Sequence, residues 1–194
     1  MVTLLYSGNF GLGHELDTVL RGLHSLNGDG TMKVLLVGSG KGLPEAQRLV
    51  SDLKLHHVEF RPPVALEDLP RLLAEGDIHL VAQKPKTEGL IVPSKIYGTL
   101  AAGRPVIFVG PDRCEVSRIV RESGCGFVVA PGDVQSAAKA LHELGGDAEL
   151  RRQMGERAKK YYEQCLGRKR SVAMILDMIN RVGGLSPDVG RRKA

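Results

Sequence analysis

The sequence has few aromatic side chains and no long apolar run. It contains no tryptophan, and aromatic residues make up 4% of its 194 residues. Base-stacking surfaces need aromatic side chains among the basic ones, so we expect no nucleic acid among its partners. No stretch is apolar over the length that a membrane helix needs, and polar residues follow Tyr6 at once, so we expect neither a membrane span nor a signal peptide.

Cysteine is also scarce, and its spacing fits no metal site. The three cysteines, Cys114, Cys125 and Cys165, form neither a CxxC motif nor a pair with histidine at ligand spacing. The sequence also lacks an Asp-x-Asp pair, which would hold a nucleotide-bound divalent ion, and a Ser/His/Asp elbow for nucleophilic catalysis. We expect reduced, structural cysteines in a cytoplasmic protein that uses no metal.

Basic residues exceed acidic ones by a small margin. There are 27 Lys and Arg against 22 Asp and Glu, a net charge of +5, and part of the excess lies at 168–170 and 191–193. A solvated face and a frayed tail are the interpretation we favour for these two runs. Attraction to an anionic membrane surface is the alternative.

Short apolar runs alternate with stretches of helical periodicity along the whole chain. The runs predict six strands, at 2–6, 32–37, 57–60, 78–81, 105–109 and 126–130. The periodic stretches predict helices at 14–26, 44–53, 66–75, 115–123, 134–144, 148–165 and 167–182, with a further helix just after 93. This alternation predicts an α/β fold with a doubly wound, Rossmann-like parallel sheet of six strands. We assign residues 1–182 to this one domain and expect 183–194 to form a flexible tail.

Two glycine-rich turns follow predicted strands. The first, Ser7-Gly-Asn-Phe-Gly-Leu-Gly-His14, leads from a strand into a helix, which is the geometry in which backbone N–H groups cradle a phosphate. Its spacing misses the dinucleotide fingerprint, and His14 stands where a Walker A loop would need lysine. A structural turn is therefore the better interpretation from the glycines alone. The second turn, at 38–42, adds Lys41 as a candidate phosphate contact.

The most informative stretch is 88–110, which has the pattern of a loop, a helix and a buried strand. Pro93 and Ser94 are typical of a helix start, and Ser94 is a good N-cap. Lys95 adds a cation where the helix dipole already attracts anions, which makes sense if a phosphate binds there. One side of the helix has little bulk, so a ligand or another backbone can approach it. The small residues there are Gly98, Ala101, Ala102 and Gly103.

The run Pro93-Ser-Lys-Ile-Tyr-Gly98, followed by Ala-Ala-Gly-Arg-Pro105, resembles the nucleotide-sugar-binding half of GT-B glycosyltransferases of family 4. The resemblance extends over nearly the whole chain and is strongest to bacterial members of exopolysaccharide and lipopolysaccharide biosynthesis. It implies the C-terminal half of a hexosyl- or N-acetylhexosaminyltransferase that moves a sugar from a nucleoside diphosphate, UDP by expectation, with retention and without a metal. It also implies a glycan or lipid-linked acceptor, met at the inner face of the plasma membrane.

The resemblance also implies roles for particular residues. The glycine turn would face the sugar and diphosphate, and Lys95 would be the catalytic residue that stabilises the departing diphosphate. The loop after the third strand would hold the base through backbone N–H groups, which Pro62 and Pro63 lack. The candidate donor contacts are Gly8, Asn9, Gly11, His14, Lys41, Arg61, Val64, Glu88, Gly89, Pro93, Ser94, Lys95 and Gly98.

The sequence departs from the family pattern at the two positions whose glutamates usually hold the ribose. The glutamate that usually holds the ribose hydroxyls falls on Gly98, and its partner eight residues earlier falls on Leu90. Glu88, two residues out of register, is a candidate substitute. Ribose recognition, and with it the nucleotide preference, is open at this point.

Two other functions stay open on the sequence alone. A UDP-N-acetylglucosamine 2-epimerase-like GT-B protein would share the fold but would present more carboxylates and histidines around the sugar. A non-catalytic nucleotide- or partner-binding domain would use the same sheet and the basic tail. Because the first strand begins at residue 2, we expect this chain to be a fragment that lacks its N-terminal acceptor-binding domain. We expect the fragment to bind nucleotide and to transfer nothing by itself.

Overall fold

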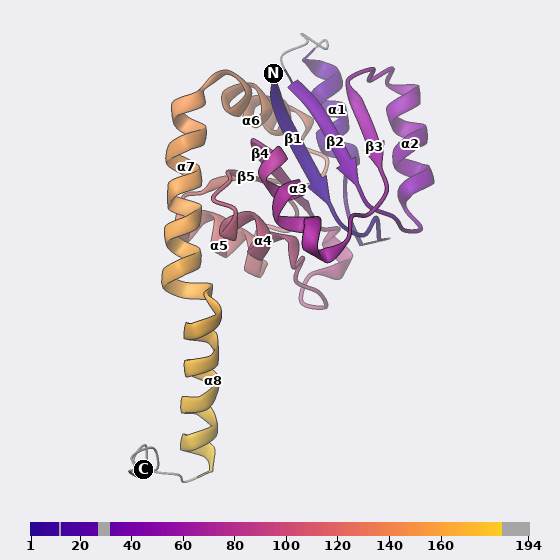
Figure 1. The fold of residues 1–194 in the computed structure, drawn as a ribbon. Helices are drawn as coiled ribbons and strands as arrows, with labels where there is room; N and C mark the ends of the chain where they lie inside the picture. The colour runs from indigo at the N-terminus through magenta and orange to yellow at the C-terminus, as the bar shows by residue number, and fades with distance from the viewer. Residues whose placement is uncertain (12, 27–31, 184–194) are drawn as a thin grey trace.

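The computed structural model describes residues 1–11, 13–26 and 32–183. Its strands are β1 (Val2–Ser7), β2 (Met32–Val37), β3 (Val58–Arg61), β4 (Ile78–Ala82), β5 (Val106–Val109) and β6 (Gly126–Val129). They form one six-stranded sheet in the order β3-β2-β1-β4-β5-β6, and every pair is parallel (Figure 1). The predicted doubly wound α/β fold is confirmed, and each strand end lies within one residue of its predicted place.

The strand order reverses direction at β1. This strand pairs with β2 on one side and with β4 on the other. The chain therefore builds one half of the sheet outward from β1 and then returns to build the other half. The loops that leave the carboxyl ends of β1 and β4 diverge at this switch point, which is where open α/β sheets bind ligands.

The helices are α1 (Asp17–Ser25), α2 (Leu43–Asp52), α3 (Leu69–Glu75), α4 (Lys95–Ala101), α5 (Glu115–Ser123), α6 (Val134–Gly146), α7 (Ala148–Tyr161) and α8 (Arg168–Val182). Three differ from prediction. Helix α1 begins at Asp17 instead of residue 14, because the His14 ring caps the preceding turn. A short 3-10 turn, Leu66–Asp68, precedes α3, whose first turn contains Pro70. Helix α7 ends at Tyr161 and passes into one π-helical turn, Tyr162–Leu166.

Side chains of β1 point alternately to the two faces of the sheet. Leu4 and Tyr6 join the large core formed with α1, α2 and α6. Leu5 joins a smaller core on the opposite face, with Leu72 of α3. Both faces of the sheet are therefore covered. Polar groups near β1 can reach a ligand only from the loop that follows its carboxyl end.

Helix α4 is anchored at its C-terminal end. Gly103 ends the helix with a φ of +66°, and its carbonyl lies so close to Gly155 of α7 that a side chain at 155 would collide with it. The Lys159 ammonium donates to the Ala101 carbonyl at 2.9 Å. The predicted close approach of another backbone occurs here, which leaves the opposite end of α4 facing the β1 loop.

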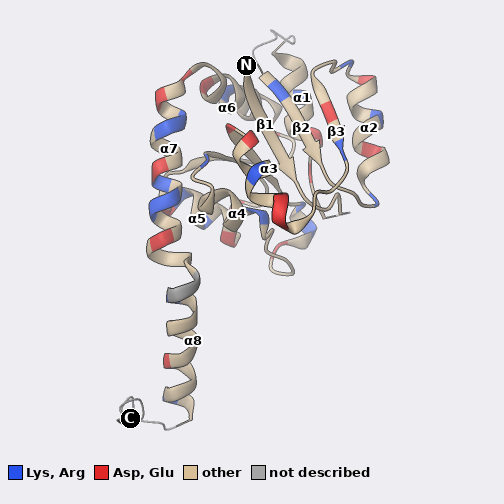
Figure 2. Ribbon diagram, viewed as in Figure 1, with Lys and Arg blue, Asp and Glu red and all other residues tan. Residues whose placement is uncertain are grey.

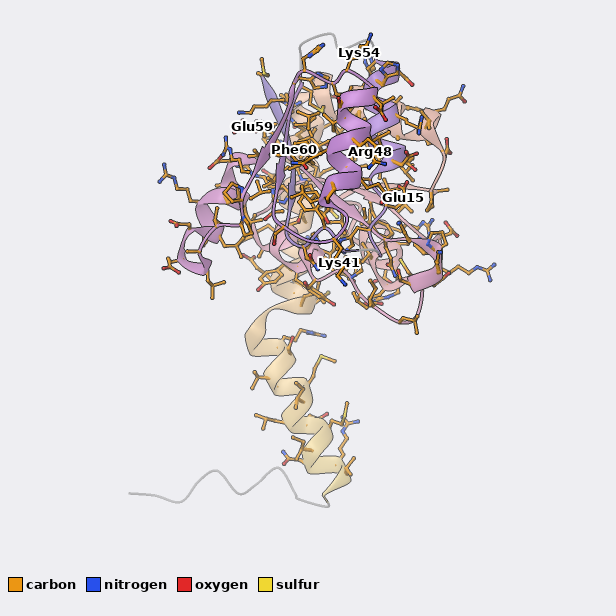
Figure 3. The ribbon with its side chains drawn as sticks, turned by 90° about the vertical axis from the view of Figure 1, so that its right-hand side faces the viewer. Glu15, Lys41, Arg48, Lys54, Glu59 and Phe60 are labelled. Atoms are coloured by element: carbon orange, nitrogen blue, oxygen red, sulfur yellow. The ribbon has the colours of Figure 1, made fainter. Side chains whose placement is uncertain are left out.

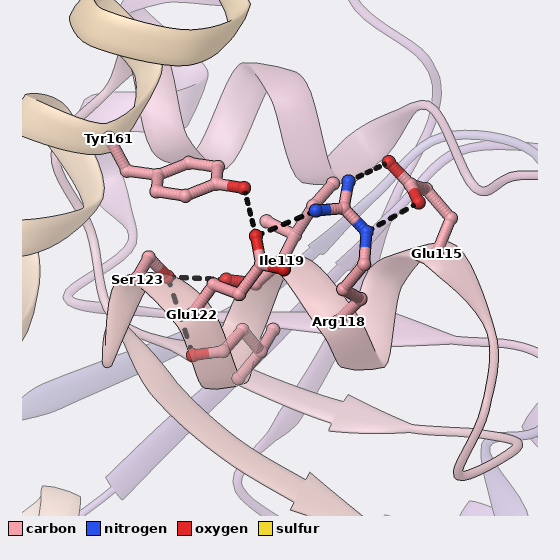
Figure 4. A network of polar contacts seen from close by, with 7 residues as sticks. Glu115, Arg118, Ile119, Glu122, Ser123 and Tyr161 are labelled. Atoms are coloured by element: carbon pink, nitrogen blue, oxygen red, sulfur yellow. Dashed lines mark hydrogen bonds and ion pairs between the residues drawn. The ribbon is translucent and has the colours of Figure 1, made fainter.

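A polar network ties α5 to the end of α7 (Figure 4). Arg118 lies between Glu115, at 2.7 Å, and Glu122, at 2.6 Å. The Tyr161 hydroxyl donates to the same Glu122 carboxylate at 2.8 Å. The network fixes the path of the chain as it leaves the domain body.

Helix α8 extends away from this body (Figure 1). Charges of both signs line α7, whereas the stretch of α8 from Ser171 to Asn180 carries one charged side chain, Asp177 (Figure 2). Its expected apolar stripe is present but exposed: Val172, Ile175, Leu176 and Ile179 each keep about half of their surface accessible. The helix is confirmed, while its stripe packs on nothing in the described part of the chain. All of the predicted tail except Gly183 lies outside the described residues.

Candidate functional site

Two loops meet at the switch point of the sheet. One is the glycine turn after β1, and the other is the segment that runs from β4 to α4. Gln83, at the end of β4, is fully buried, and its amide donates to the carbonyls of Thr87 and Ile91. This side chain holds the second loop folded back toward α4, so that the start of α4 lies against the glycine turn.

The glycine turn is held by the turn that follows β2. Gly8 N donates to the Val37 carbonyl at 2.9 Å, and Phe10 N donates to Ser39 at 2.7 Å. Gly8 has a φ of +132°, which favours glycine. A Cβ atom at Gly8 would also lie 2.8 Å from Cε of Lys95. Glycine is therefore required at this position both for its conformation and for the space that Lys95 occupies.

His14 faces inward from the end of the glycine turn. Its Nδ1 accepts a hydrogen bond from Gly11 N at 3.2 Å and lies 2.8 Å from the Tyr6 hydroxyl. Because Nδ1 is an acceptor, the ring proton of the neutral form sits on Nε2. Burial, followed by the positive charge of Lys95, lowers the pKa of His14 to about 4. At neutral pH the imidazole is an uncharged donor.

Lys95 is the central cation of the site. Its ammonium lies 4.8 Å from the centroid of the Tyr6 ring, within cation–π range. Burial lowers its pKa to about 8. Among the described residues, no carboxylate forms an ion pair with it. A half-buried cation without a counter-ion favours the binding of an anion at this point.

Unpaired backbone donors surround this cation. The N–H groups of Asn9, Ser94 and Lys95 have no hydrogen-bond acceptor in the described part of the chain. Ser94 occupies the N-cap position as predicted, but its backbone is helical and its hydroxyl caps nothing. The prediction of a side-chain cap was wrong, because the helical backbone at Ser94 replaces the extended geometry that capping needs.

A cavity of about 490 Å³ opens beside Lys95. Its lining includes Gly8, Asn9, His14, Ser94 and Lys95, together with Leu69 and Leu73 of α3 and Gly98 and Thr99 of α4. Gly8 lies against the Lys95 side chain and Gly98 lies against Leu73, and we call these two parts of the cavity the Lys95 end and the leucine end. This volume lies within the range of small-molecule and cofactor sites. The cavity brings seven of the predicted donor residues together: Gly8, Asn9, His14, Pro93, Ser94, Lys95 and Gly98.

The other predicted residues lie outside the lining of this cavity. Lys41 is exposed near the start of α2 (Figure 3). Arg61 is held in ion pairs with Glu59, at 2.6 Å, and Glu75, at 2.8 Å. Val64 is exposed on the loop after β3. Their roles toward a donor stay predictions.

Three further candidates lie near the site without lining the cavity. Gly11 contributes through its bond to His14. Glu88 and Gly89 lie on the exposed turn before α4, where Gly89 has a φ of +74° and open space around it. Glu88, the candidate substitute for the glutamate that usually holds the ribose, therefore does not line the cavity.

Sequence reasoning missed a buried pair in the wall of the cavity, His79 and Thr99. Nδ1 of His79, on β4, lies 3.0 Å from the Thr99 hydroxyl, and its Nε2 lies 2.9 Å from the Leu73 carbonyl. Burial lowers the pKa of His79 to about 4, so the ring is neutral. The apolar runs around both residues gave no sign of the pair, since only the sheet register brings β4 and α4 together. Tyr6 was missed as well, because a tyrosine in an apolar strand is typical of a core.

A second cavity, of about 310 Å³, lies between α1 and α2 and shares His14 with the first. Acidic and basic side chains alternate around it, including Glu15, Glu45, Arg48 and Lys84; Glu15 and Arg48 are labelled in Figure 3. A diphosphate would meet like charges there. The cavity beside Lys95 is therefore the better anion site.

The described residues contain neither a group of metal-binding side chains nor a membrane-spanning helix. No three His, Cys, Asp or Glu side chains in 1–11, 13–26 and 32–183 are grouped so that they could hold a metal ion. Within the same residues, no helix has the length and apolarity required to cross a membrane.

Nucleotide-binding α/β domains typically have a parallel sheet of this strand order and a cavity suited to an anion at its switch point. Residues 2–161 match the family model described as glycosyl transferases group 1, and the chain belongs to this family. The resemblance read from the sequence is confirmed.

Relatives and solved structures agree with this assignment. WcaI of Escherichia coli K12, named for colanic acid biosynthesis, is 26% identical over 177 residues, or 91% of this chain. The N-acetyl-alpha-D-glucosaminyl L-malate synthase of Bacillus anthracis is 27% identical over 86% of the chain. Anabaena HepE, solved in complex with UDP-glucose, has the same fold with a TM-score of 0.74 at 19% identity, covering 92% of this chain and 48% of HepE. The chain spans 42% of the length of each of the two curated relatives.

Proposed function

We propose that this chain is the donor-binding domain of a glycosyltransferase and that the cavity beside Lys95 holds a nucleoside diphosphate sugar, with UDP as the nucleotide. The observation that carries the proposal is the Lys95 ammonium, half-buried, unpaired among the described residues and surrounded by free N–H groups. The UDP-glucose named for HepE supports the choice of nucleotide.

The chemistry follows from where these donors point. Glycosyl transfer breaks the bond between the anomeric carbon and a diphosphate oxygen, and negative charge grows on the departing diphosphate. Preorganised donors stabilise that charge most when water is excluded. Lys95 is the catalytic residue of this step in our proposal, and the backbone N–H groups of Asn9 and Ser94 assist it. The neutral His14 ring offers Nε2–H as a further donor.

The acceptor and the complete reaction depend on more than this chain. Since the curated relatives are more than twice as long, we propose that an N-terminal domain supplies the acceptor site and that the chain alone binds donor without turnover. We propose a glycan or lipid-linked acceptor, and the colanic acid biosynthesis for which WcaI is named supports this choice. Retention of configuration and a place at the inner face of the plasma membrane belong to the same proposal.

The lining of the cavity favours a transferase over an epimerase. An epimerase must move protons on the sugar, for which it needs acid and base side chains around the ring. In the described residues, the cavity lining contains two histidines, His14 and His79, and no carboxylate. Both ring nitrogens of His79 lie within hydrogen-bond distance of protein groups, the Thr99 hydroxyl and the Leu73 carbonyl.

The proposal is tested by calorimetric titration of UDP into the wild type and Lys95→Ala, without added metal. We expect saturable binding to the wild type and a loss of about tenfold or more in Lys95→Ala, the usual effect of removing a hydrogen bond to a charged group. Lys160→Ala, which removes an exposed lysine of α7, is the matched control for net charge. Equal UDP affinity in all three proteins would contradict the proposal.

A further inference from the structure

Tyr6 is buried next to the donor cavity and is not among the residues that line it. It is the second-last residue of β1, where a phenylalanine would fill the same space in the core. A buried hydroxyl needs hydrogen-bond partners inside the protein, and both neighbours of this hydroxyl belong to the glycine turn. The ring lies under the ammonium of Lys95. One buried side chain therefore contacts both loops that form the site.

The ring of Tyr6 holds the Lys95 ammonium in place. The nitrogen lies 4.8 Å from the ring centroid, and the side chain passes so close to Gly8 that a Cβ atom there would lie 2.8 Å from Cε. A free lysine side chain has many rotamers, and fixing one of them costs conformational entropy. Attraction to the ring face offsets this cost before a ligand arrives. The ammonium is thus preorganised, which strengthens the binding of an anion.

The hydroxyl of Tyr6 holds the glycine turn. It donates to the Asn9 carbonyl at 2.7 Å, while Phe10 N, in the same peptide group, donates to the Ser39 carbonyl at 2.7 Å. This peptide is therefore fixed at both of its polar groups, directly after the free N–H of Asn9. The hydroxyl oxygen also lies 2.8 Å from Nδ1 of His14. Burial raises the pKa of Tyr6, so the hydroxyl keeps its proton at neutral pH.

We propose that Tyr6 is the positioning residue of the donor site: its ring fixes the Lys95 ammonium and its hydroxyl fixes the turn at Asn9, so that both loops present their donors to one diphosphate. This inference rests on the proposed function. Tyr6 touches no atom of the donor and acts only through Lys95 and the glycine turn. Its two contributions are separable, because the hydroxyl can be removed without the ring.

The experiment measures the effect of Lys95→Ala on UDP affinity in three backgrounds. These are the wild type, Tyr6→Phe, which keeps the ring, and Tyr6→Leu, which removes it. If Tyr6→Leu does not fold, Tyr6→Met takes its place, because methionine adapts to irregular core space. Phe108→Leu is the matched control, since it removes an equally buried ring from β5 that does not line the cavity. Thermal unfolding sets a temperature at which every variant is folded.

We expect Lys95→Ala to weaken UDP binding by about tenfold in the wild type and equally in Tyr6→Phe, because both keep the ring under the ammonium. In Tyr6→Leu the same change should weaken binding by at most about threefold, since an ammonium that is not held contributes less. Tyr6→Phe alone should weaken UDP binding by about fivefold, through the lost hydrogen bond to the Asn9 carbonyl. Phe108→Leu should lower Tm and leave the effect of Lys95→Ala unchanged.

The other outcomes contradict the inference in distinct ways. A residue that only stabilised the fold would leave the effect of Lys95→Ala the same in all backgrounds, and this result would overturn the inference while leaving the donor-binding proposal intact. Wild-type UDP affinity in Tyr6→Phe would overturn the role of the hydroxyl. The absence of saturable UDP binding by the wild type would overturn the proposed function and this inference together.

Discussion

The Lys95 end and the leucine end of one cavity are built in opposite ways. Loops form the first, and their N–H groups and one ammonium have no partner in the described part of the chain. Packed helices form the second, where the His79 ring donates to the Leu73 carbonyl and lies 3.0 Å from the Thr99 hydroxyl. Unpaired polar groups mark where a ligand is recognised, and paired ones mark where it is merely accommodated. The Lys95 end therefore offers unpaired donors to a ligand, whereas the leucine end offers mainly apolar surface.

The largest expected effect comes from Gly8→Val, which closes the Lys95 end. The new side chain would collide with Lys95 and would force a φ of +132° on a β-branched residue. We expect UDP binding to be lost and the free energy of unfolding to fall by about 1–3 kcal/mol. Titration and thermal unfolding measure the two effects.

Gly132→Ala separates strain from collision in this experiment. Gly132 has a φ of +87° but open space around it. Its substitution should lower stability by about 1 kcal/mol while UDP binding is kept. If Gly8→Val bound UDP as well as Gly132→Ala does, the proposed contact between Gly8 and Lys95 would have no role.

The next effect is a dependence of binding on pH that arises only at the Lys95 end. Burial lowers the pKa of free Lys95 to about 8, and only the protonated amine attracts the diphosphate. We expect constant UDP affinity from about pH 7 to 7.5, where a phosphate with a second pKa of about 6 is fully ionised. Above about pH 8 the affinity should fall, by at most about tenfold per pH unit.

Lys95→Arg is the control for this profile, because a guanidinium stays protonated throughout the range. Its affinity for UDP should be flat between pH 7 and 9.5. An unchanged decline in Lys95→Arg would assign the pH dependence to another group.

The smallest expected effect is on stability. The lowered pKa means that folding disfavours the charged form of Lys95, so the free energy of unfolding should rise with pH between about 8 and 10.4, where the unfolded chain still holds the proton. Lys95→Met removes the buried charge and keeps the volume. We expect it to gain up to about 1 kcal/mol, or about 2–4 °C in Tm, while it loses UDP binding.

A calorimetric scan at pH 7 measures this gain. A lower Tm for Lys95→Met would show that the contact with the Tyr6 ring outweighs the cost of burying the ammonium. Lys95 would then be a structural residue as much as a binding one.

The sequence predicted the sheet closely and the site only at one end. Alternating apolar runs locate all six strands, because parallel strands buried on both faces leave a clear signal. The glycine turn and the Pro93–Lys95 run also predict the cationic end, since glycine, proline and lysine have strong local meaning. His14 was placed inside a helix because its bond to Gly11 has no sequence signature.

The residues that form the leucine end of the cavity could not be predicted from the sequence. Leu69 and Leu73 fit the periodicity of a core helix, and nothing in that pattern tells which cavity they wall. The pairing of His79 with Thr99 depends on the distance between β4 and α4 after folding. The exposed stripe of α8 has the same origin, because periodicity shows an apolar face and does not show what covers it.

The most direct test of this account is to map UDP on the protein by amide chemical shifts in isotope-labelled samples. We predict that titration with UDP shifts the amides of Asn9, Ser94 and Lys95 most, with a smaller change at Gly98. Shifts confined to Gly42, Ala46 and Arg48 would place the nucleotide between α1 and α2 instead, and would contradict the assignment of the donor to the cavity beside Lys95.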